Sequence, residues 1–324
     1  GEATARRVPA GSMAESSHRD NQRGVACQFR LTSPLTLWPL DITAAEYLPS
    51  AAAMQALRVG SGPSVHAGLR ITLKHLATSA NAGGKSKPIS ELNIDDLVIH
   101  ILGHRGEQDA IYEQLFARLA GIVIRHLDDN GDPRATRLPL SAIEQIGFSP
   151  AEALFPPDGR VAPGFVLLRE FFAFPDKFLG FRLTELGAAL ARSAADTVDL
   201  VFEFTEVAAP LAARVSKKSF GLFVAPAVNL FEKRCDRIRL SAGRHEHHVV
   251  PDRSALLEYE PHRIVSVAAI FAGKADGAPV LPLQQSPEYA RTLRALGLGL
   301  RCGEGHGMRW LLQTRRLPLV GTVS

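Results

Sequence analysis

The chain has 324 residues, of which 46% are hydrophobic and 22% charged, and its formal net charge is +4. This composition is typical of a globular protein with a hydrophobic core, while the absence of any apolar run near ~18 residues argues against a membrane-spanning helix. The Lys and Arg residues are too scattered to predict nucleic-acid binding, and three distant cysteines without a CxxC pair favour a reducing compartment.

Strand and helix patterns alternate in the first part of the chain. Residues 69–76 alternate between apolar and polar side chains, which predicts a half-buried strand, and the apolar segments 97–102 and 122–127 predict two more strands. Residues 107–121 carry apolar side chains at helical spacing, with acids early and a glycine late, which predicts an amphipathic helix. The Gly- and Lys-rich segment 80–88 predicts a flexible, dispensable loop. This order of elements indicates α+β packing.

Two helices and a strand are predicted next. Residues 141–147 are typical of a short helix that begins at a serine and ends at a glycine. Residues 164–174 predict a second helix, which Pro163 can begin and Pro175 must end, because proline fits the first turn but not the interior. Residues 177–183 then alternate as a strand.

An unusually aromatic segment, EFFAFPDKFLGF, spans residues 170–181 and holds five of the 16 phenylalanines in the chain. We interpret it as a buried joint between a helix end, a proline turn and a strand, because phenylalanine is most often buried. An exposed aromatic binding patch is the main alternative, and a membrane contact is the weakest. The residues that would form the joint are Phe171, Phe172, Phe174, Pro175, Phe178 and Phe181.

The second half of the chain is predicted to be rich in strands. Residues 198–207 form the clearest strand pattern, and shorter strand-like segments follow up to residue 271. We therefore expect an α+β, β-rich fold with mixed or antiparallel sheets and a few short helices. The predicted regions are 1–137, a first α+β region; 138–183, the helix–proline–strand joint; and 184–324, a β-rich region that is truncated at its C-terminal end.

A histidine-rich segment, RHEHHVVPD at 244–252, is the one candidate metal site. On a strand, His245 and His247 project to the same face and could share a metal, with Glu246, His248 or Asp252 as further ligands. The spacing is not that of a helical HExxH site, so polar strand residues near a turn are the favoured interpretation. No nucleophile, base and acid come together elsewhere. The residues alone predict a non-catalytic protein without a cofactor.

Four sequence blocks occur in an order that resembles a known family. They are 27–46, CQFRLTSPLTLWPLDITAAE; 154–183, which contains the aromatic segment; 226–240, PAVNLFEKRCDRIRL; and 245–253, HEHHVVPDR. Together they resemble the TssF family (also called VasA or ImpG), the baseplate wedge subunit of the bacterial type VI secretion system. Family members are much longer, so the chain is expected to be a central fragment.

Three positions depart from the family pattern. Gly180 stands where a bulky residue is common, Arg182 where an acid is frequent, and His247 where an aromatic residue is frequent. The first departure predicts a looser core, and the second predicts a different partner on that face. The third weakens the interpretation of a metal site.

The resemblance implies a structural role without catalysis, in a multi-domain subunit similar to the wedge proteins of contractile phage tails. It implies association with the subunits TssG, TssK and TssE, with a second TssF copy and with the VgrG spike hub. It also implies a cytoplasmic assembly that docks on the inner-membrane complex of a Gram-negative bacterium and supports sheath assembly. Besides the aromatic segment, the structural or partner motif would comprise Trp38, Pro39, Asn229, Leu230, Phe231, Glu246, Pro251 and Asp252.

Two other functions remain open from the residues. One is a metal-dependent enzyme that uses His245 and His247, and the other is a nucleic-acid-binding module, which only the pI near 9.1 suggests.

Overall fold

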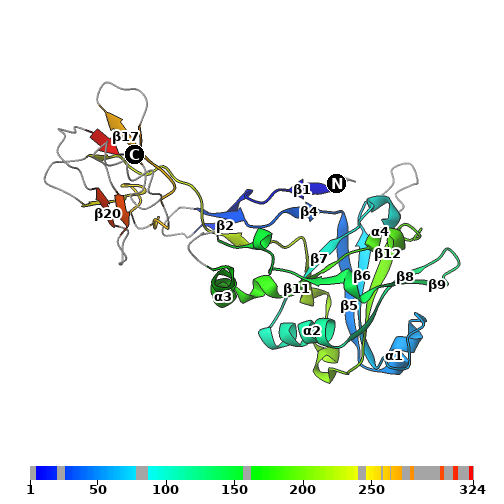
Figure 1. Ribbon diagram of the computed structural model, residues 1–324. Helices are drawn as coiled ribbons and strands as arrows, with labels where there is room; N and C mark the ends of the chain where they lie inside the picture. The colour runs from blue at the N-terminus through cyan, green and yellow to red at the C-terminus, as the bar shows by residue number, and fades with distance from the viewer. Residues whose placement is uncertain are drawn as a thin grey trace. The chain divides into compact units, whose positions relative to one another are not determined.

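The computed structural model describes residues 5–19, 26–77, 87–155, 162–239, 246–256, 258–262, 264–271, 278–280, 300–302, 309–312 and 321–323. The chain divides into two compact units, one made of Gly1–Ala14 with Phe29–Val228 and the other of Glu15–Gln28 with Asn229–Ser324. Both are rich in antiparallel strand pairs, as the fold prediction expected, and the helices of the first unit are short (Figure 1).

A five-stranded antiparallel sheet forms the centre of the first unit (Figure 1). Strands on either side pair with both edges of its middle strand, β12 (Thr197–Phe204), and apolar clusters cover both of its faces, so the strand is almost entirely buried. Phe202 and Phe204 point into the main core from one face, and Val201 packs into a smaller cluster on the other. The strand order is β5 (Leu40–Leu48), β6 (Ala67–His75), β12 (Thr197–Phe204), β8 (Leu119–Leu127), β9 (Pro133–Leu138).

A four-stranded antiparallel sheet packs against the central sheet through the main core. The ring of Phe181 meets the ring of Phe202 edge-on, with 5.3 Å between their centroids, so one contact joins a strand of each sheet. The strand order is β10 (Ile143–Gln145), β11 (Gly180–Leu183), β7 (Leu97–Ile101), β13 (Phe220–Leu222).

The remaining elements of the first unit are short. Its α-helices are α1 (Ala51–Ala56), α2 (Arg105–Ala117), α3 (Pro163–Ala173) and α4 (Leu186–Leu190). The 3-10 helices are η2 (Ile89–Leu92), η3 (Leu140–Ala142), η4 (Pro150–Glu152), η5 (Pro175–Phe178), η6 (Ala209–Ala213) and η7 (Lys217–Ser219). Strand β1 (Arg6–Val8) pairs with β4 (Leu35–Leu37), and β14 (Ala227–Val228) pairs with the end of β3 (Ala26–Leu31). Strand β2 spans Met13–Arg19, of which Glu15–Arg19 belong to the second unit.

The second unit contains two antiparallel sheets of short strands. One has the order β15 (Ile238–Arg239), β21 (Gly321–Val323), β17 (Val267–Phe271), β18 (Ala278–Val280). The other has the order β16 (Glu246–His248), β20 (Arg309–Leu312), β19 (Leu300–Cys302). No helix among the described residues is long and apolar enough to cross a membrane.

Most of the elements predicted in the first unit are confirmed. The strands predicted from alternation appear as β6 and β12, those predicted from apolar segments as β7 and β8, and the helix predicted at 164–174 appears as α3. The helix predicted at 107–121 appears as α2 but ends at Ala117, because Leu119 already begins β8. The loop predicted at 80–88 lies outside the described residues except for its last two positions.

The short helix predicted at 141–147 is wrong. The segment forms the end of η3 and then β10, where Ile143 pairs with Leu183 and Gln145 with Phe181 across the β10–β11 ladder. A neighbouring strand edge overrides a weak local helix preference here.

The predicted region boundaries after residues 137 and 183 fall inside the first compact unit, where β12 pairs with β6 and β8.

Candidate partner-binding surface

The aromatic segment is only partly the buried joint that its sequence predicts. Phe178 and Phe181 are buried in the first unit. Phe171, Phe172 and Phe174 are instead exposed, Phe172 to 78% of its surface. The prediction of a joint formed by all five rings is therefore wrong for these three residues. Among residues 164–173 of α3, only the side chain of Glu170 is fully buried, and Phe174 follows the end of the helix.

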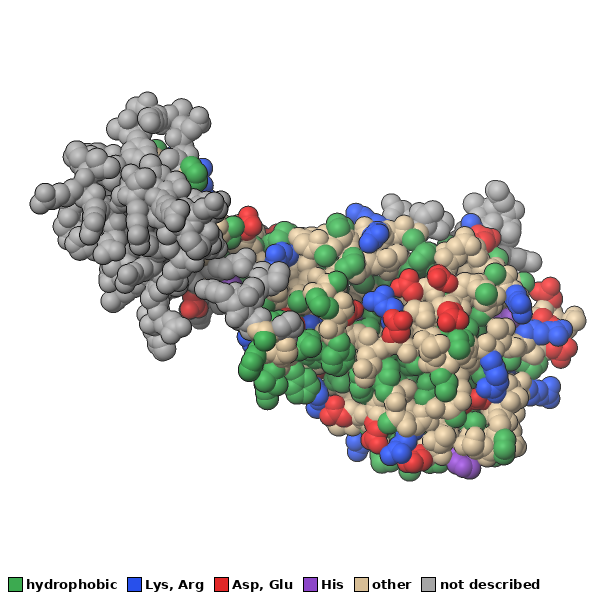
Figure 2. Space-filling view, in the orientation of Figure 1, with side chains coloured by type: hydrophobic (Ala, Val, Ile, Leu, Met, Phe, Trp, Pro, Cys, Tyr) green, Lys and Arg blue, Asp and Glu red, His purple; other side chains and the backbone are tan. Residues whose placement is uncertain are grey.

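The outward side of α3 carries large apolar side chains. Phe165, Leu168 and Phe172 lie at helical positions i, i+3 and i+7, so they share one face of the helix, and they are 67%, 51% and 78% exposed. Figure 2 shows hydrophobic side chains gathered over this part of the first unit. We call this surface the aromatic ridge, defined as Phe165, Leu168, Phe171, Phe172 and Phe174.

A buried ion pair fixes the inner side of α3. The Lys177 ammonium on η5 donates to the Glu170 carboxylate, and both side chains are almost completely enclosed. The same carboxylate accepts hydrogen bonds from the backbone N–H groups of Leu154 at 2.8 Å and Phe155 at 3.3 Å. A buried charge is tolerated only when it is paired and hydrogen-bonded, so this arrangement holds α3, η5 and residues 154–155 in one geometry.

Aromatic contacts support the ridge from below. The ring centroid of Phe171 lies 5.9 Å from that of the buried Phe178. The ring of Phe148 also contacts Phe178, with 5.0 Å between the centroids. Next to them, Gly147 has a φ of +89°, and an added Cβ would lie 3.0 Å from the Lys177 carbonyl oxygen. The backbone therefore approaches too closely for a larger residue. The guanidinium of Arg169 covers the ring of Phe155 at 4.4 Å from its centroid.

The two departures on β11 have clear structural consequences. At Gly180, an added Cβ would lie 2.6 Å from the Ile146 Cδ1 atom and 2.8 Å from the Ile99 carbonyl oxygen. The core is therefore tight at this strand, and the predicted looser packing is wrong. Arg182 makes ion pairs within the chain, to Asp96 at 3.2 Å and to Glu152 at 3.4 Å. These ion pairs explain a basic residue at this position without a contact to another protein.

The motif residues near the first block have structural positions. Trp38 is half-buried and packs against the main core. Pro39 is also half-buried, and its carbonyl oxygen accepts a hydrogen bond of 2.8 Å from the Leu76 N–H group. In the third block, Asn229 is exposed and Leu230 is half-buried. The contacts of Trp38 and Pro39 indicate that these two residues stabilise the fold.

The second unit brings several predicted motif residues together. Phe231 meets Tyr259 with 6.1 Å between the ring centroids, and the Lys233 ammonium lies 4.2 Å from the centroid of the same tyrosine. Lys233 also pairs with Asp252 at 3.2 Å. Hydrogen bonds from Ser254 and from Lys233 lower the pKa of Asp252, and the bond to Asp252 raises the pKa of Lys233. Pro251, beside this carboxylate, is half-buried. The cluster ties the third block to the fourth.

The histidine segment is described only in part. His245 lies outside the described residues, while Glu246, His247 and His248 form β16, where His247 pairs with Trp310 of β20. Within the described ranges, no three His, Cys, Asp or Glu side chains are grouped closely enough to hold a metal ion.

The sequence analysis missed two residues of the ridge and the ion pair that positions it. Phe165, Leu168 and the Glu170–Lys177 pair were not singled out as functional. The signal available was the one acidic residue of a mostly apolar helix, seven residues before a lysine that follows the helix-ending proline.

Comparison with known proteins identifies a family, a relative and a solved structure. The family model "Type VI secretion system, TssF" matches residues 2–296. The type VI secretion system component TssF1 of Pseudomonas aeruginosa is 34% identical over 265 residues, which cover 82% of this chain and 40% of that protein. A chain from the type VI secretion system TssK-TssF-TssG baseplate subcomplex aligns with 100% of this chain and 56% of its own length, with a TM-score of 0.67 and 20% identity. The chain thus spans less than half the length of its curated relative.

Proposed function

Because the chain belongs to the TssF family of the type VI secretion system, we propose that it is part of a structural, non-catalytic subunit of the secretion baseplate. Its proposed direct partners are a TssG-type and a TssK-type subunit. The solved baseplate subcomplex, in which TssK, TssF and TssG are named together, supports this proposal. The proposal extends to TssE, the VgrG hub and a second TssF copy, and to a cytoplasmic wedge at the inner-membrane complex that supports sheath assembly.

The aromatic ridge is the observation that supports a partner contact in this part of the subunit. Contiguous exposed apolar side chains mark protein–protein interfaces, and aromatic residues dominate the binding energy of such interfaces. The buried Glu170–Lys177 pair positions the ridge before any partner arrives. A preformed surface loses less conformational freedom on binding than a mobile one. We infer that the ridge docks against the TssG-type subunit.

Co-expression of the full chain with a TssG-type subunit tests this proposal. The double variant Phe165→Ser and Phe172→Ser removes the two most exposed rings of the ridge, and we expect its affinity for the partner to fall by at least about thirtyfold. The matched control is Leu76→Ser with Leu127→Ser, because both leucines are large, apolar and about half exposed outside the ridge. The control should keep its affinity within about threefold.

Two outcomes would contradict the proposal at different levels. Equal binding by the ridge variant and the wild type would reject the ridge as the docking surface. Failure of the wild-type chain, and of the longer subunit that contains it, to capture any TssG-type subunit would reject the baseplate role itself.

A further inference from the structure

A hollow of about 280 Å³ opens where the two sheets of the first unit meet at one edge. Strand β5 ends the order of the central sheet, and β13 ends the order of the four-stranded sheet. Among the described residues, no backbone hydrogen bond joins these two strands. We call this hollow the edge groove.

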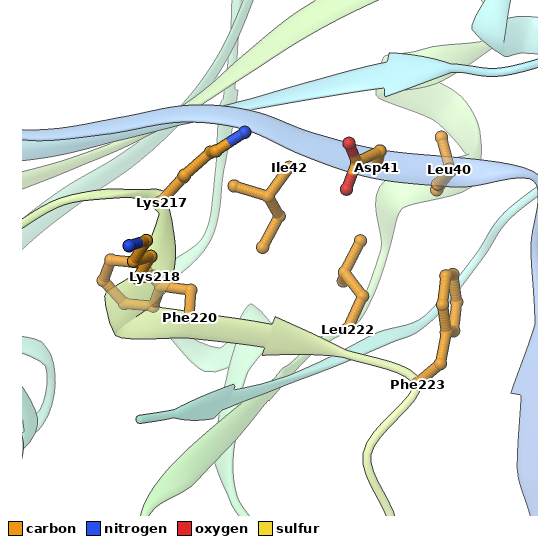
Figure 3. Close-up of a pocket in the computed structure, with 8 residues that line it drawn as sticks. All are labelled: Leu40, Asp41, Ile42, Lys217, Lys218, Phe220, Leu222 and Phe223. Carbon is orange, nitrogen blue, oxygen red and sulfur yellow. The ribbon is translucent and has the colours of Figure 1, made fainter. Parts of the chain in front are cut away.

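The edge groove is lined mostly by apolar side chains and is basic at one end. Ile42 and Phe220 form its floor and are almost completely buried. Figure 3 shows Lys217 and Lys218 at one end, beside Ile42 and Phe220, and Asp41 on the opposite wall. The two lysines are exposed, and no salt bridge to either is found among the described residues. They form the only Lys–Lys pair in the sequence.

One wall of the groove is held in an unusual backbone conformation. Phe223 has a φ of +58°, in the left-handed region that a bulky residue rarely adopts. Its ring lines the groove next to Leu222 (Figure 3). Strained residues of this kind persist where the surrounding structure enforces them, and they concentrate at ligand-binding sites.

Size and charge together select the occupant. The hollow is slightly smaller than typical small-molecule pockets, which are about 300–1,000 Å³, so it suits a side chain or two better than a cofactor. Strand edges with unpaired backbone groups accept extended peptides, and the pockets beside them read the side chains. Lys217 and Lys218, for which no salt bridge is found among the described residues, attract carboxylates at their end of the groove even with Asp41 on the opposite wall.

We propose that the edge groove binds an extended segment of another protein, in which apolar side chains enter the hollow and acidic residues beside them face Lys217 and Lys218. This binding site shares no residue with the aromatic ridge. The inference therefore stands apart from the proposed contact with the TssG-type subunit, and its test needs no baseplate partner.

Fluorescence polarisation with short labelled peptides tests the proposal on the full chain at about 50 mM salt, where screening is weak. The probe is an acetylated octapeptide with two central leucines preceded by three glutamates. One comparison peptide replaces the glutamates by lysines, and a second replaces the leucines by serines. We expect the probe to bind at least about tenfold more tightly than either comparison peptide.

Charge reversal identifies the site. The double variant Lys217→Glu with Lys218→Glu should weaken binding of the probe by at least about tenfold, because the acidic residues then meet like charges. The matched control is Arg58→Glu with Arg192→Glu, which changes the net charge equally at two exposed positions outside the groove. The control should stay within about twofold of wild type. All four substituted side chains are exposed, and a thermal melt of each variant checks that folding is unchanged.

Three results would overturn the inference. The first is no binding of the probe to the wild-type chain at about 1 mM peptide. The second is an equal loss of binding in the Lys217, Lys218 variant and in the control, which would indicate non-specific charge attraction. The third is equal binding of the serine peptide, which would indicate an anion site without apolar recognition.

Discussion

Two buried carboxylates, Glu170 on the inner side of α3 and Glu203 on β12, are paired in different ways. Glu203 accepts a hydrogen bond from Arg137 at 2.7 Å and another from Ser61, and the Arg137 side chain is 46% exposed. Glu170 pairs with Lys177, which is enclosed as completely as its partner. The helix that carries the aromatic ridge is therefore positioned by an ion pair that is enclosed away from water. In the central sheet, the buried carboxylate of Glu203 pairs instead with Arg137, whose guanidinium water can reach.

The substitution Lys177→Met should have one of the largest effects on stability, because it leaves the Glu170 charge buried without its cation. We expect the free energy of unfolding to fall by about 3–5 kcal/mol. Urea denaturation followed by circular dichroism measures this change. In the double variant Glu170→Gln with Lys177→Met, the charge is gone while an acceptor for Leu154 and Phe155 remains, so we expect much of the loss to be recovered. A loss below about 1 kcal/mol in the single variant would contradict an enclosed ion pair.

Alanine substitution of a buried and of an exposed phenylalanine in the aromatic segment should reduce the stability by different amounts. Phe181→Ala removes a fully buried ring from the contact between the two sheets, so we expect a loss of about 3–5 kcal/mol. Phe174→Ala removes a ring that is 42% exposed, so we expect a loss below about 1 kcal/mol. Matched urea denaturation curves of the two variants give the difference. Equal losses would restore the interpretation of a single buried joint.

The exposed partner of Glu203 should matter less than Lys177. Arg137→Met leaves the Glu203 carboxylate with the Ser61 hydroxyl and with access to water through the space that the guanidinium occupied. We expect the free energy of unfolding to fall by about 1–2 kcal/mol. The comparison with Lys177→Met in the same denaturant series sharpens the contrast between the two carboxylates. A larger loss for Arg137→Met than for Lys177→Met would reverse it.

Protonation of His100 should weaken the first unit in mild acid. Burial of His100 on β7 lowers its pKa, and the nearby Glu152 charge and a hydrogen bond to the Val224 backbone oppose this only in part. Below a pH of about 6.5 the unfolded chain therefore binds more protons than the folded chain, so stability falls as the pH is lowered. We expect at most about 1.4 kcal/mol per pH unit from this group. The His100→Gln variant should show a flatter pH dependence in thermal melts between pH 5 and 8, and an unchanged slope would contradict this role.

The sequence predicts elements better than it predicts their surroundings. The period-2 alternation of β6 and β12 is a local signal, and both strands appear as expected. The bounds of α3 also follow from local chemistry, because prolines stand at its first turn and just after its end. Its exposure does not follow, since burial depends on which distant segments cover a helix. β10 was missed for a similar reason, because its three residues are a strand only through pairing with β11.

The same distinction between local sequence signals and contacts with distant segments applies to the candidate surfaces. The resemblance to the TssF family pointed to the aromatic segment and to the cluster around Phe231 and Asp252, which the structure brings together with Lys233 and Tyr259. The edge groove could not be predicted, because it is lined by residues 40–42 and 217–223, whose contact depends on how two sheets pack.

Hydrogen–deuterium exchange of the full chain, alone and with a TssG-type subunit, tests most directly whether α3 is a docking surface. We predict that amides of residues 164–174 exchange more slowly in the complex, while those of β12, already buried on both faces, do not change. Unchanged exchange across α3 in a complex that is demonstrably formed would contradict it.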